Sequence, residues 1–427
     1  MRLTTPEPPG IISPPQRRSL EISVTHIRTQ AVHAGQTPDP ATGAIATGIA
    51  QTTAFAFGSM ARGANLFSGV EAGWTYSRSG NPTLAALEAK LAALEGGEAA
   101  ATFGTGMAAL SAIVFALLNP GDELAYLGPL YGGAESHFTG LCQRLGIKAL
   151  ALQPQDLEGD LPPRTRMLWI ETPTNPTLKL HDLAQVAAIA RPRGIITVAD
   201  NTFCTPCLTR PLSFGLDLAY HSMTKYLGGH GDATGGAVVG PVPLVDRIRK
   251  TGLDHLGGSL APHTAYLFLR GIKTLPLRMT AHCENAARVA AFLDGHAGVR
   301  RVYYPGLVGH PDHALARQQM TEGYGGIVSF ELKRPGRAAV AAFLDGLRLF
   351  TQAVSLGDVN SLACHPASTT HSFISAEARQ GQGIGDDLVR LSVGIEDAGD
   401  LIADLEQALA AVDRLQEPAV QQQVASA

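Results

Sequence analysis

The sequence predicts an α/β protein with a mostly parallel sheet in a large domain and a smaller C-terminal α+β domain. The apolar run 167–170 is followed by a helical pattern and then by a second apolar run, 195–199. Such a strand–helix–strand unit implies parallel strands with helices on the faces of the sheet. After Leu267 the pattern changes to long helices, such as 274–293 and 401–415, with strands near 327–332 and 388–393.

Four segments follow from this pattern: a leader (1–22), an N-terminal arm (23–78), the large domain (79–266) and the small domain (267–427). The 427 residues exceed what one ordinary core needs. Five prolines among the first twenty residues predict a disordered leader, and Arg17-Arg18 lacks the apolar run of a twin-arginine export signal. The arm has little periodicity, so we expect it to reach a neighbouring subunit because it cannot form a core alone.

The elements of the large domain follow in order. Leucines at helical spacing from Leu84 to Leu94 predict a helix that ends at Gly96-Gly97. The next apolar runs predict a strand over 99–103, a buried helix over 107–118 and a strand over 123–127. After 167–170 and 195–199, a last strand is expected over 216–220.

The composition of the chain excludes several classes of protein. Hydrophobic residues make up 45% and charged residues 16%, which is typical of a compact enzyme and not of a disordered chain. The net charge of −4 without a long basic run gives no footprint for nucleic acid. The longest apolar stretch, 107–118, is too short to span a bilayer, so no membrane partner is expected.

Cysteine and histidine usage points to a reducing cytoplasm and to no metal. Five cysteines do not suit a disulfide framework in a chain of this length. Cys204 and Cys207 have the spacing of a redox or metal pair, yet no second pair completes a zinc site, so packing near the site is the favoured interpretation. His310 and His313 likewise have no further ligands clustered with them.

The most informative pair of residues is Asp200 and Lys225. Each follows an apolar run that predicts a strand, and the carboxyl ends of parallel strands meet at one edge of a sheet. Pyridoxal phosphate chemistry requires a lysine that forms a Schiff base with the cofactor aldehyde and an acid that keeps the pyridine nitrogen protonated. Ser222 and Thr224 alternate with Lys225 and are suited to hold a phosphate.

An acyl-enzyme of the β-lactamase kind is the competing interpretation of this segment. Ser222–Lys225 is an S-x-x-K string and Lys250–Gly252 a K-T-G string. The S-D-N element is missing, and Ser222 ends a strand where that chemistry needs it to open a helix. For Lys225 alone, a solvated surface lysine is the other alternative.

Gly104-Thr105-Gly106 precedes the helix 107–118 and can be interpreted in three ways. A dinucleotide fingerprint would need an acid at the end of the next strand, but Asp122 and Glu123 precede that strand. A phosphate on the amides at the helix N-terminus is the favoured interpretation. A purely structural turn is the third.

Four further residues have both a structural and a functional interpretation. Tyr76 and Arg78 precede a capped helix; they are either exposed or a phosphate clamp that reaches into a neighbouring subunit. Tyr131 either packs on the core or stacks on a pyridine ring and serves as an acid/base. Arg390 lies in an alternating strand, either on its solvated face or as a clamp for a carboxylate.

At this point the chain resembles the Cys/Met-metabolism PLP enzymes, which include cystathionine γ-synthase, cystathionine and methionine γ-lyases and O-acylhomoserine sulfhydrylases. The resemblance runs from about Thr29 to Val412. It covers these ordered motifs: Tyr76–Thr83, Thr105–Met107, Tyr131–Gly133, Glu171–Pro176, Asp200–Thr202, Ser222–Asp232, Ser355–Asp358, His365–His371 and Arg390–Gly394.

The resemblance implies the aspartate-aminotransferase-like fold (fold type I), pyridoxal 5'-phosphate as cofactor and a homotetramer built from tight dimers with shared sites. Lys225 is similar to the Schiff-base lysine, Asp200 to the pyridinium partner and Tyr131 to the ring-stacking acid/base. The remaining residues match two groups. The phosphate cup would comprise Gly106, Met107, Ser222 and Thr224, with Tyr76 and Arg78 from the partner subunit; the substrate carboxylate would be bound by Ser355, Arg390 and Asn175.

The activity implied is γ-elimination from a sulfur-containing or γ-substituted amino acid, giving a 2-oxo acid and ammonia. Residues 355–371 and 390–397 resemble methionine γ-lyase most. That enzyme has cysteine where this chain has Gly133, which is common in the synthase and sulfhydrylase branches, and its Gly-Leu-Lys-Asp-Met segment is replaced by Gly252-Leu253-Asp254-His255-Leu256. A γ-replacement transferase is therefore the alternative, and a non-catalytic protein of the same fold a remote one.

Overall fold

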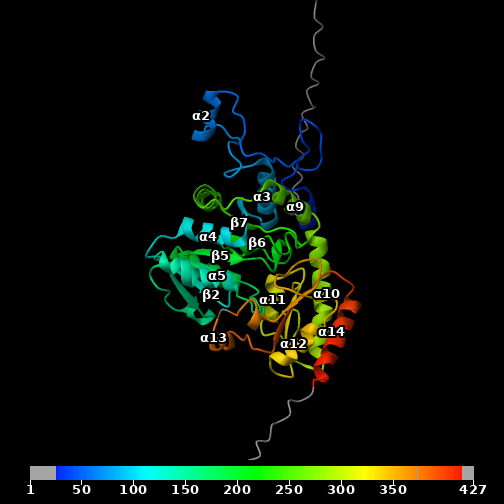
Figure 1. Ribbon diagram of the computed structural model, residues 1–427. Helices are drawn as coiled ribbons and strands as arrows, with labels where there is room; N and C mark the ends of the chain where they lie inside the picture. The colour runs from blue at the N-terminus through cyan, green and yellow to red at the C-terminus, as the bar shows by residue number, and fades with distance from the viewer. Residues whose placement is uncertain (1–25, 373, 416–427) are drawn as a thin grey trace, which may run out of the picture.

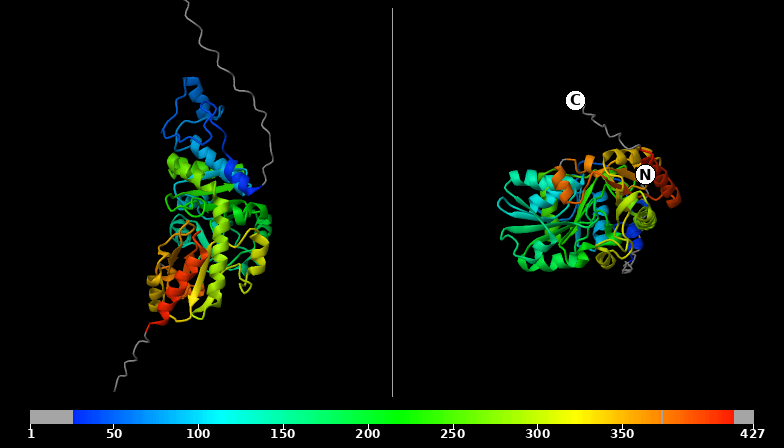
Figure 2. Two further views of the ribbon diagram at one scale, coloured as in Figure 1. Left: turned by 90° about the vertical axis from the view of Figure 1, so that its right-hand side faces the viewer. Right: turned by 90° about the horizontal axis from the view of Figure 1, so that it is seen from below.

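The computed structural model describes residues 26–372 and 374–415, and the expected leader lies outside them. Two sheets divide the fold: a seven-stranded sheet from residues 99–240 and a five-stranded sheet from residues 299–392. The arm projects from one end of the molecule and the five-stranded sheet lies toward the other (Figures 1 and 2). Among the described helices, none is long and apolar enough to cross a membrane.

The large sheet has the order β1-β7-β6-β5-β4-β2-β3. All neighbours are parallel except those of β7, which runs antiparallel to both β1 and β6. The α/β fold class is thereby confirmed. The strands are β1 (Ala99–Phe103), β2 (Glu123–Leu127), β3 (Lys148–Leu152), β4 (Thr165–Glu171), β5 (Ile196–Asp200), β6 (Leu218–Ser222) and β7 (Gly236–Gly240).

Helices cover both faces of this sheet because successive strand residues point to opposite sides. On one face Trp169 and its neighbours form a core with α4 (Gly106–Leu117) and α8 (Val242–Arg249). On the other face Leu168 and Ile170 contact α6 (Leu183–Ala190), and Ala219 and Val239 contact α3 (Pro82–Glu95) and α9 (Pro262–Ile272). The remaining helices of this region are α5 (Gly132–Ser136), α7 (Thr205–Leu208) and the π-helical segments His137–Cys142 and Lys250–His255.

The smaller sheet has the order β10-β11-β12-β9-β8 and is mostly antiparallel. One core joins it to α10, α12 and α14. Its strands are β8 (Val299–Tyr303), β9 (Ile327–Leu332), β10 (Thr351–Gln352), β11 (Leu362–Cys364) and β12 (Leu388–Ser392). Its helices are α10 (Leu275–Gly295), α11 (His313–Gln319), α12 (Arg337–Gly346), α13 (Ala376–Gly381) and α14 (Ala398–Asp413).

The arm is attached to the body by a buried lysine. Lys90 of α3 donates to the carbonyl oxygens of Ala31 (2.7 Å) and Val32 (3.3 Å) in α1 (Ile27–His33). Beyond this contact the arm carries α2 (Met60–Ser68), which projects from the body (Figure 1).

The expected elements agree closely with the structure, but two strands of the large sheet, β3 and β7, and three of the small sheet, β8, β10 and β11, were not expected. The strands expected over 99–103, 123–127 and 327–332 have those bounds, whereas the two expected over 195–199 and 216–220 begin later and end at Asp200 and Ser222. β3 was missed because its side chains are only partly buried, and β7 because it opens on glycine. The boundary expected near residue 267 falls inside α9 and stays a prediction.

Gly236 permits close contact between β7 and the start of α4, so we expect Gly236→Ala to destabilise the fold. An ideal Cβ there would lie 2.3 Å from the Thr105 carbonyl oxygen and 2.8 Å from the Gly106 Cα. Overpacking against backbone costs about 1–3 kcal/mol, which should lower the melting temperature in a thermal scan. In the matched control, Gly295→Ala, the new Cβ meets no atom of the described residues within 4 Å other than those of its chain neighbours and its own helix backbone. Equal melting of both variants would contradict this reasoning.

Candidate active site

A cavity of about 800 Å³ opens where β4, β5 and β6 end. The three strands terminate at Glu171, Asp200 and Ser222, as parallel neighbours with a common carboxyl edge must. The cavity brings together nine of the residues expected from sequence: Met107, Tyr131, Asn175, Asp200, Ser222, Thr224, Lys225, Ser355 and Arg390.

Lys225 lies in this cavity with its amine directed at the small-sheet side. Its Nζ donates to the Ser355 Oγ at 2.8 Å. Burial and the positive charge of Arg390 lower the pKa of Lys225 to about 8, against an opposing effect of Asp358. The amine is therefore much closer to its neutral, nucleophilic form at physiological pH than an exposed lysine, which excludes a solvated surface lysine.

Ser355 reaches this position through an uncommon backbone conformation. Its φ is 89°, in the left-handed region that side chains other than glycine rarely adopt. Its hydroxyl contacts Lys225, while its carbonyl oxygen accepts from Arg390 Nη2 at 2.9 Å. A strained residue thus links two cations of the cavity.

Asp200 is a carboxylate whose charge depends on its neighbours. Its Oδ1 accepts from the Thr202 N–H at 3.0 Å. Burial raises the pKa of Asp200, while the Thr202 hydrogen bonds and then His221 oppose that rise. A cation placed against Asp200 would offset the burial, and a protonated pyridine nitrogen is such a cation.

The start of α4 offers backbone donors to the same cavity. Thr105 caps the helix by accepting from the Ala108 N–H at 3.0 Å, and the first-turn amides of a twelve-residue helix attract anions. An ideal Cβ on Gly106 would lie 2.6 Å from the Tyr220 hydroxyl and 3.2 Å from the Ser222 Oγ. Glycine at 106 therefore lets the helix start close to Ser222, which is the cradle that a phosphate needs.

Arg390 is buried in β12, so the alternative that placed it on a solvated face is wrong. It is 3% exposed; its Nη1 donates to the Asn175 Oδ1 at 3.0 Å and its Nη2 to the Ser355 carbonyl. Its Nε is buried and has no hydrogen-bond partner within the described part of the chain. A guanidinium held in this way and facing a cavity suits a carboxylate ligand.

Tyr131 caps the N-terminus of α5 with its ring half-exposed at the cavity. Its N–H donates to the Glu171 Oε2 at 2.6 Å. Glu171, at the end of β4, lines the cavity but was given no role on sequence grounds. The signal that identified Asp200, an acid that closes an apolar run, applies equally to Glu171.

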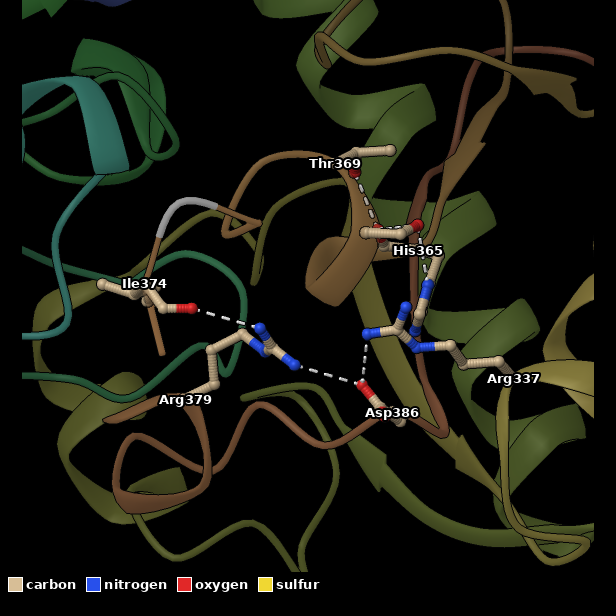
Figure 3. A network of polar contacts seen from close by, with 7 residues as sticks. Arg337, His365, Thr369, Ile374, Arg379 and Asp386 are labelled. Atoms are coloured by element: carbon tan, nitrogen blue, oxygen red, sulfur yellow. Dashed lines mark hydrogen bonds and ion pairs between the residues drawn. The ribbon is translucent and has the colours of Figure 1, made fainter. Parts of the chain in front are cut away.

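A segment between β11 and β12 forms another wall through Thr369 and Thr370. Polar contacts among Arg337, His365, Thr369, Ile374, Arg379 and Asp386 link parts of this segment and its surroundings (Figure 3). The Thr369 hydroxyl donates to the His365 carbonyl at 2.7 Å, and Asp386 accepts from both Arg379 and Arg337 at 3.3 Å. Asp386 therefore links this segment to α12 and to its own helix α13.

Tyr76 and Arg78 are not brought to this cavity in their own chain. They line a separate surface depression together with Gln51 and Ser259, and the Arg78 guanidinium lies 5.5 Å from the centre of the Tyr76 ring. Both side chains are exposed, so their expected role in a partner's phosphate cup stays a prediction.

The cysteine pair after β5 has the character of core residues. Burial raises the pKa of the Cys204 and Cys207 thiols to about 12. Such thiols remain protonated, which favours packing over redox or metal chemistry. Across the described residues, no group of three or more potential ligands could hold a metal ion.

The chain is similar to known proteins over most of its length. The family model described as "Cys/Met metabolism PLP-dependent enzyme" matches residues 28–410. An L-methionine gamma-lyase of Pseudomonas putida is 48% identical over 387 residues, covering 90% of this chain and 97% of the relative. A cystathionine gamma-synthase of Mycobacterium bovis is 43% identical, covering 89% and 96%. The crystal structure of cystathionine gamma synthase from Xanthomonas oryzae pv. oryzae in complex with cystathionine superposes with a TM-score of 0.85 at 43% identity, covering 91% and 99%.

The surroundings of Lys225 predict opposite effects of two charge deletions. In protein freed of cofactor, the labelling rate of Lys225 by an amine reagent should rise through about pH 8, because its pKa is lowered and the neutral amine prevails above that value. Arg390→Leu should move this midpoint to higher pH, and Asp358→Asn should move it to lower pH. Mass spectrometry of the labelled peptide measures the midpoint. A midpoint near that of free lysine, or equal shifts in one direction, would contradict the assignment.

Proposed function

The chain belongs to the Cys/Met metabolism PLP-dependent enzymes, and on this premise we propose that it catalyses γ-elimination from a sulfur-containing amino acid. A methionine-like substrate would consume one water and yield a 2-oxo acid, ammonia and a thiol. The observation that carries the proposal is the cavity in which Lys225, Asp200 and Arg390 face one space. Its amine, acid and guanidinium are the groups that an amino-acid substrate and this cofactor need.

In this proposal Lys225 transfers protons and Asp200 stabilises positive charge on the cofactor. Pyridoxal phosphate, when bound, supplies an aldehyde that condenses with amines and a ring that accepts the electron pair of a broken Cα–H bond. Lys225 removes and returns protons at the substrate, for which its pKa of about 8 is suitable. Asp200 would be the acid that keeps the ring nitrogen protonated.

The other residues orient the cofactor and the substrate. Gly106, Met107, Ser222 and Thr224 would hold the phosphate at the start of α4, where free amides and the helix dipole favour an anion. Arg390, Asn175 and Ser355 would bind the substrate carboxylate. Tyr131 would stack on the ring and, with Lys225, protonate the departing γ-substituent.

γ-Replacement is the second candidate, and Gly133 is the feature that favours it. This glycine is common in the synthase and sulfhydrylase branches that the chain resembles. An ideal Cβ at Gly133 would lie 2.5 Å from Tyr131 Cε1 and 3.2 Å from the Tyr131 hydroxyl. The segment that also departs from the methionine γ-lyase pattern contacts the residue that follows the arm, because the Ser79 hydroxyl donates to Asp254 Oδ1 at 2.6 Å. In this alternative a thiol adds at the substrate Cγ where elimination would release the unsaturated product.

The assembly proposed is a homotetramer built from tight dimers, in which each arm completes the partner's site. The arm exposes large apolar side chains, with Met60 92%, Phe67 75% and Val70 77% accessible. Apolar groups so exposed indicate a surface that another subunit covers. Tyr76 and Arg78 would then add a phenol and a guanidinium to the partner's phosphate cup. A cytoplasmic location is part of the same proposal.

A substrate panel distinguishes the two activities. Purified enzyme is incubated with methionine, homocysteine, cystathionine and O-acylhomoserines, with and without added thiol. Oxo acid without thiol supports elimination, whereas thioether formed only from an acyl ester and a thiol supports replacement. Borohydride reduction that tags Lys225 with cofactor supports the proposed role of this lysine. Neither product from any substrate would contradict both candidates.

Gly133→Ala should lower the turnover number by about 10- to 100-fold, because the new methyl group displaces the Tyr131 ring. Steady-state kinetics on the best substrate of the panel measures the effect. Gly140→Ala is the matched control, since no atom lies within 4 Å of its Cβ. Full activity in Gly133→Ala would show that the ring position is not needed.

Shared sites predict that two inactive variants complement each other. Lys225→Ala and Arg78→Ala protomers are unfolded together, refolded and assayed. Each mixed dimer would contain one site with both residues intact, so about a quarter of the sites should be restored if dimers form at random. The variants refolded separately are the control. No recovery in the mixture would place Arg78 outside the partner's site.

A further inference from the structure

Glu171 is a buried carboxylate at the centre of the cavity edge. It is the last residue of β4 and lies in register with Asp200, the last residue of β5. Its side chain is 4% exposed and lines the cavity beside Tyr131. Two carboxylates side by side in a buried place are costly, so a second one requires a reason.

The two oxygens of Glu171 accept from the backbone of two different residues that line the cavity. Oε2 accepts from the Tyr131 N–H at 2.6 Å and Oε1 from the Asn175 N–H at 2.9 Å. Tyr131 carries the half-exposed ring at one wall. Asn175 in turn accepts from Arg390 through its side-chain oxygen at 3.0 Å. The Glu171 carboxylate therefore fixes the backbone of Tyr131, which carries the ring, and the backbone of Asn175, which binds the Arg390 guanidinium.

We propose that Glu171 is a positioning residue that sets the Tyr131 ring and the Asn175–Arg390 pair at a fixed separation. The inference rests on the proposed function, in which the ring faces the cofactor and the guanidinium faces the substrate carboxylate. A carboxylate suits this task because both of its oxygens are acceptors. Glutamine has one acceptor oxygen, so it can retain one of the two amides and must release the other.

The charges around Glu171 agree with this role. Burial and the adjacent Asp200 raise its pKa, whereas the Tyr131 and Asn175 amides and then Arg390 lower it. The amides thus favour the anionic form, and Arg390 contributes from the wall that Glu171 helps to hold.

The test compares Glu171→Gln with Glu135→Gln in the cofactor-loaded enzyme. Glu135 lies on α5, half-buried one turn beyond Tyr131, but it lines a different cavity with Tyr126 and Gln382. Two readouts are used: the visible circular dichroism of bound cofactor, which reports its asymmetric surroundings, and the dissociation constant for glycine, which carries the substrate carboxylate but no γ-substituent.

Glu171→Gln should alter the dichroic band and weaken glycine binding by about tenfold, the effect of one lost hydrogen bond to a charged group. Glu135→Gln should leave both readouts at the parent values. A change in thermal stability alone, with both readouts intact, would show that Glu171 only supports the fold and would overturn the proposal. A change in one readout without the other would overturn the joint role.

Glu171→Asp covers the case in which the glutamine variant does not fold. Its side chain is one methylene shorter and cannot reach both amides, so both readouts should again shift; parental values would overturn the proposal. Borohydride tagging of the parent enzyme distinguishes failure of the proposed function from failure of the Glu171 inference. A parent that carries no cofactor at Lys225 would overturn the proposed function together with this inference, whereas a tagged parent with unaltered Glu171 variants would overturn the inference alone.

Discussion

The carboxyl ends of the neighbouring parallel strands β4, β5 and β6 are the constraint on which the site depends. Glu171 faces Asp200 across one pair of strands, and Asp200 faces Tyr220 across the next. Parallel strands set these neighbours about 4.8 Å apart and end them at a common edge. Because the edge is fixed by backbone hydrogen bonds, the acids and the segment leading to Lys225 are placed by the sheet and not by flexible loops. Every further contact of the cavity builds on that placement.

The cavity at this edge of the sheet brings two basic and two acidic side chains together. Lys225 and Arg390 bring positive charge to the small-sheet side, and Asp200 and Glu171 bring negative charge to the large-sheet side. Burial raises the pKa of both acids and lowers the pKa of Lys225, so it disfavours the charged form of these three groups. A cofactor with a basic ring nitrogen would place a positive charge next to Asp200. The carboxylate of an amino-acid substrate would place a negative charge next to Arg390. Perturbed groups gathered in one cavity are typical of catalytic sites.

Much of this arrangement was predictable because it rests on local patterns. Asp200 and Lys225 were found from apolar runs that end at polar residues, and the register confirms that such runs lie side by side. Arg390 could not be decided from its strand, since alternation does not tell which face is covered; only the fold shows Asn175 and Ser355 packed against it. β7 was not predicted because glycine and small side chains have a weak preference for strands. Its antiparallel direction also depends on pairing with β1, which is distant in the sequence. Tyr76 and Arg78 lie outside the cavity in their own chain, so their expected role is not decided by the fold of one subunit.

Ser355 illustrates a conflict between durability and chemistry. Its left-handed backbone, at φ 89°, costs on the order of 1–3 kcal/mol, and glycine would remove that cost. Glycine has no hydroxyl to accept from the Lys225 amine. Selection for thermal stability alone would therefore favour glycine at this position. Serine at 355 lowers the melting temperature but retains the hydrogen bond to the Lys225 amine.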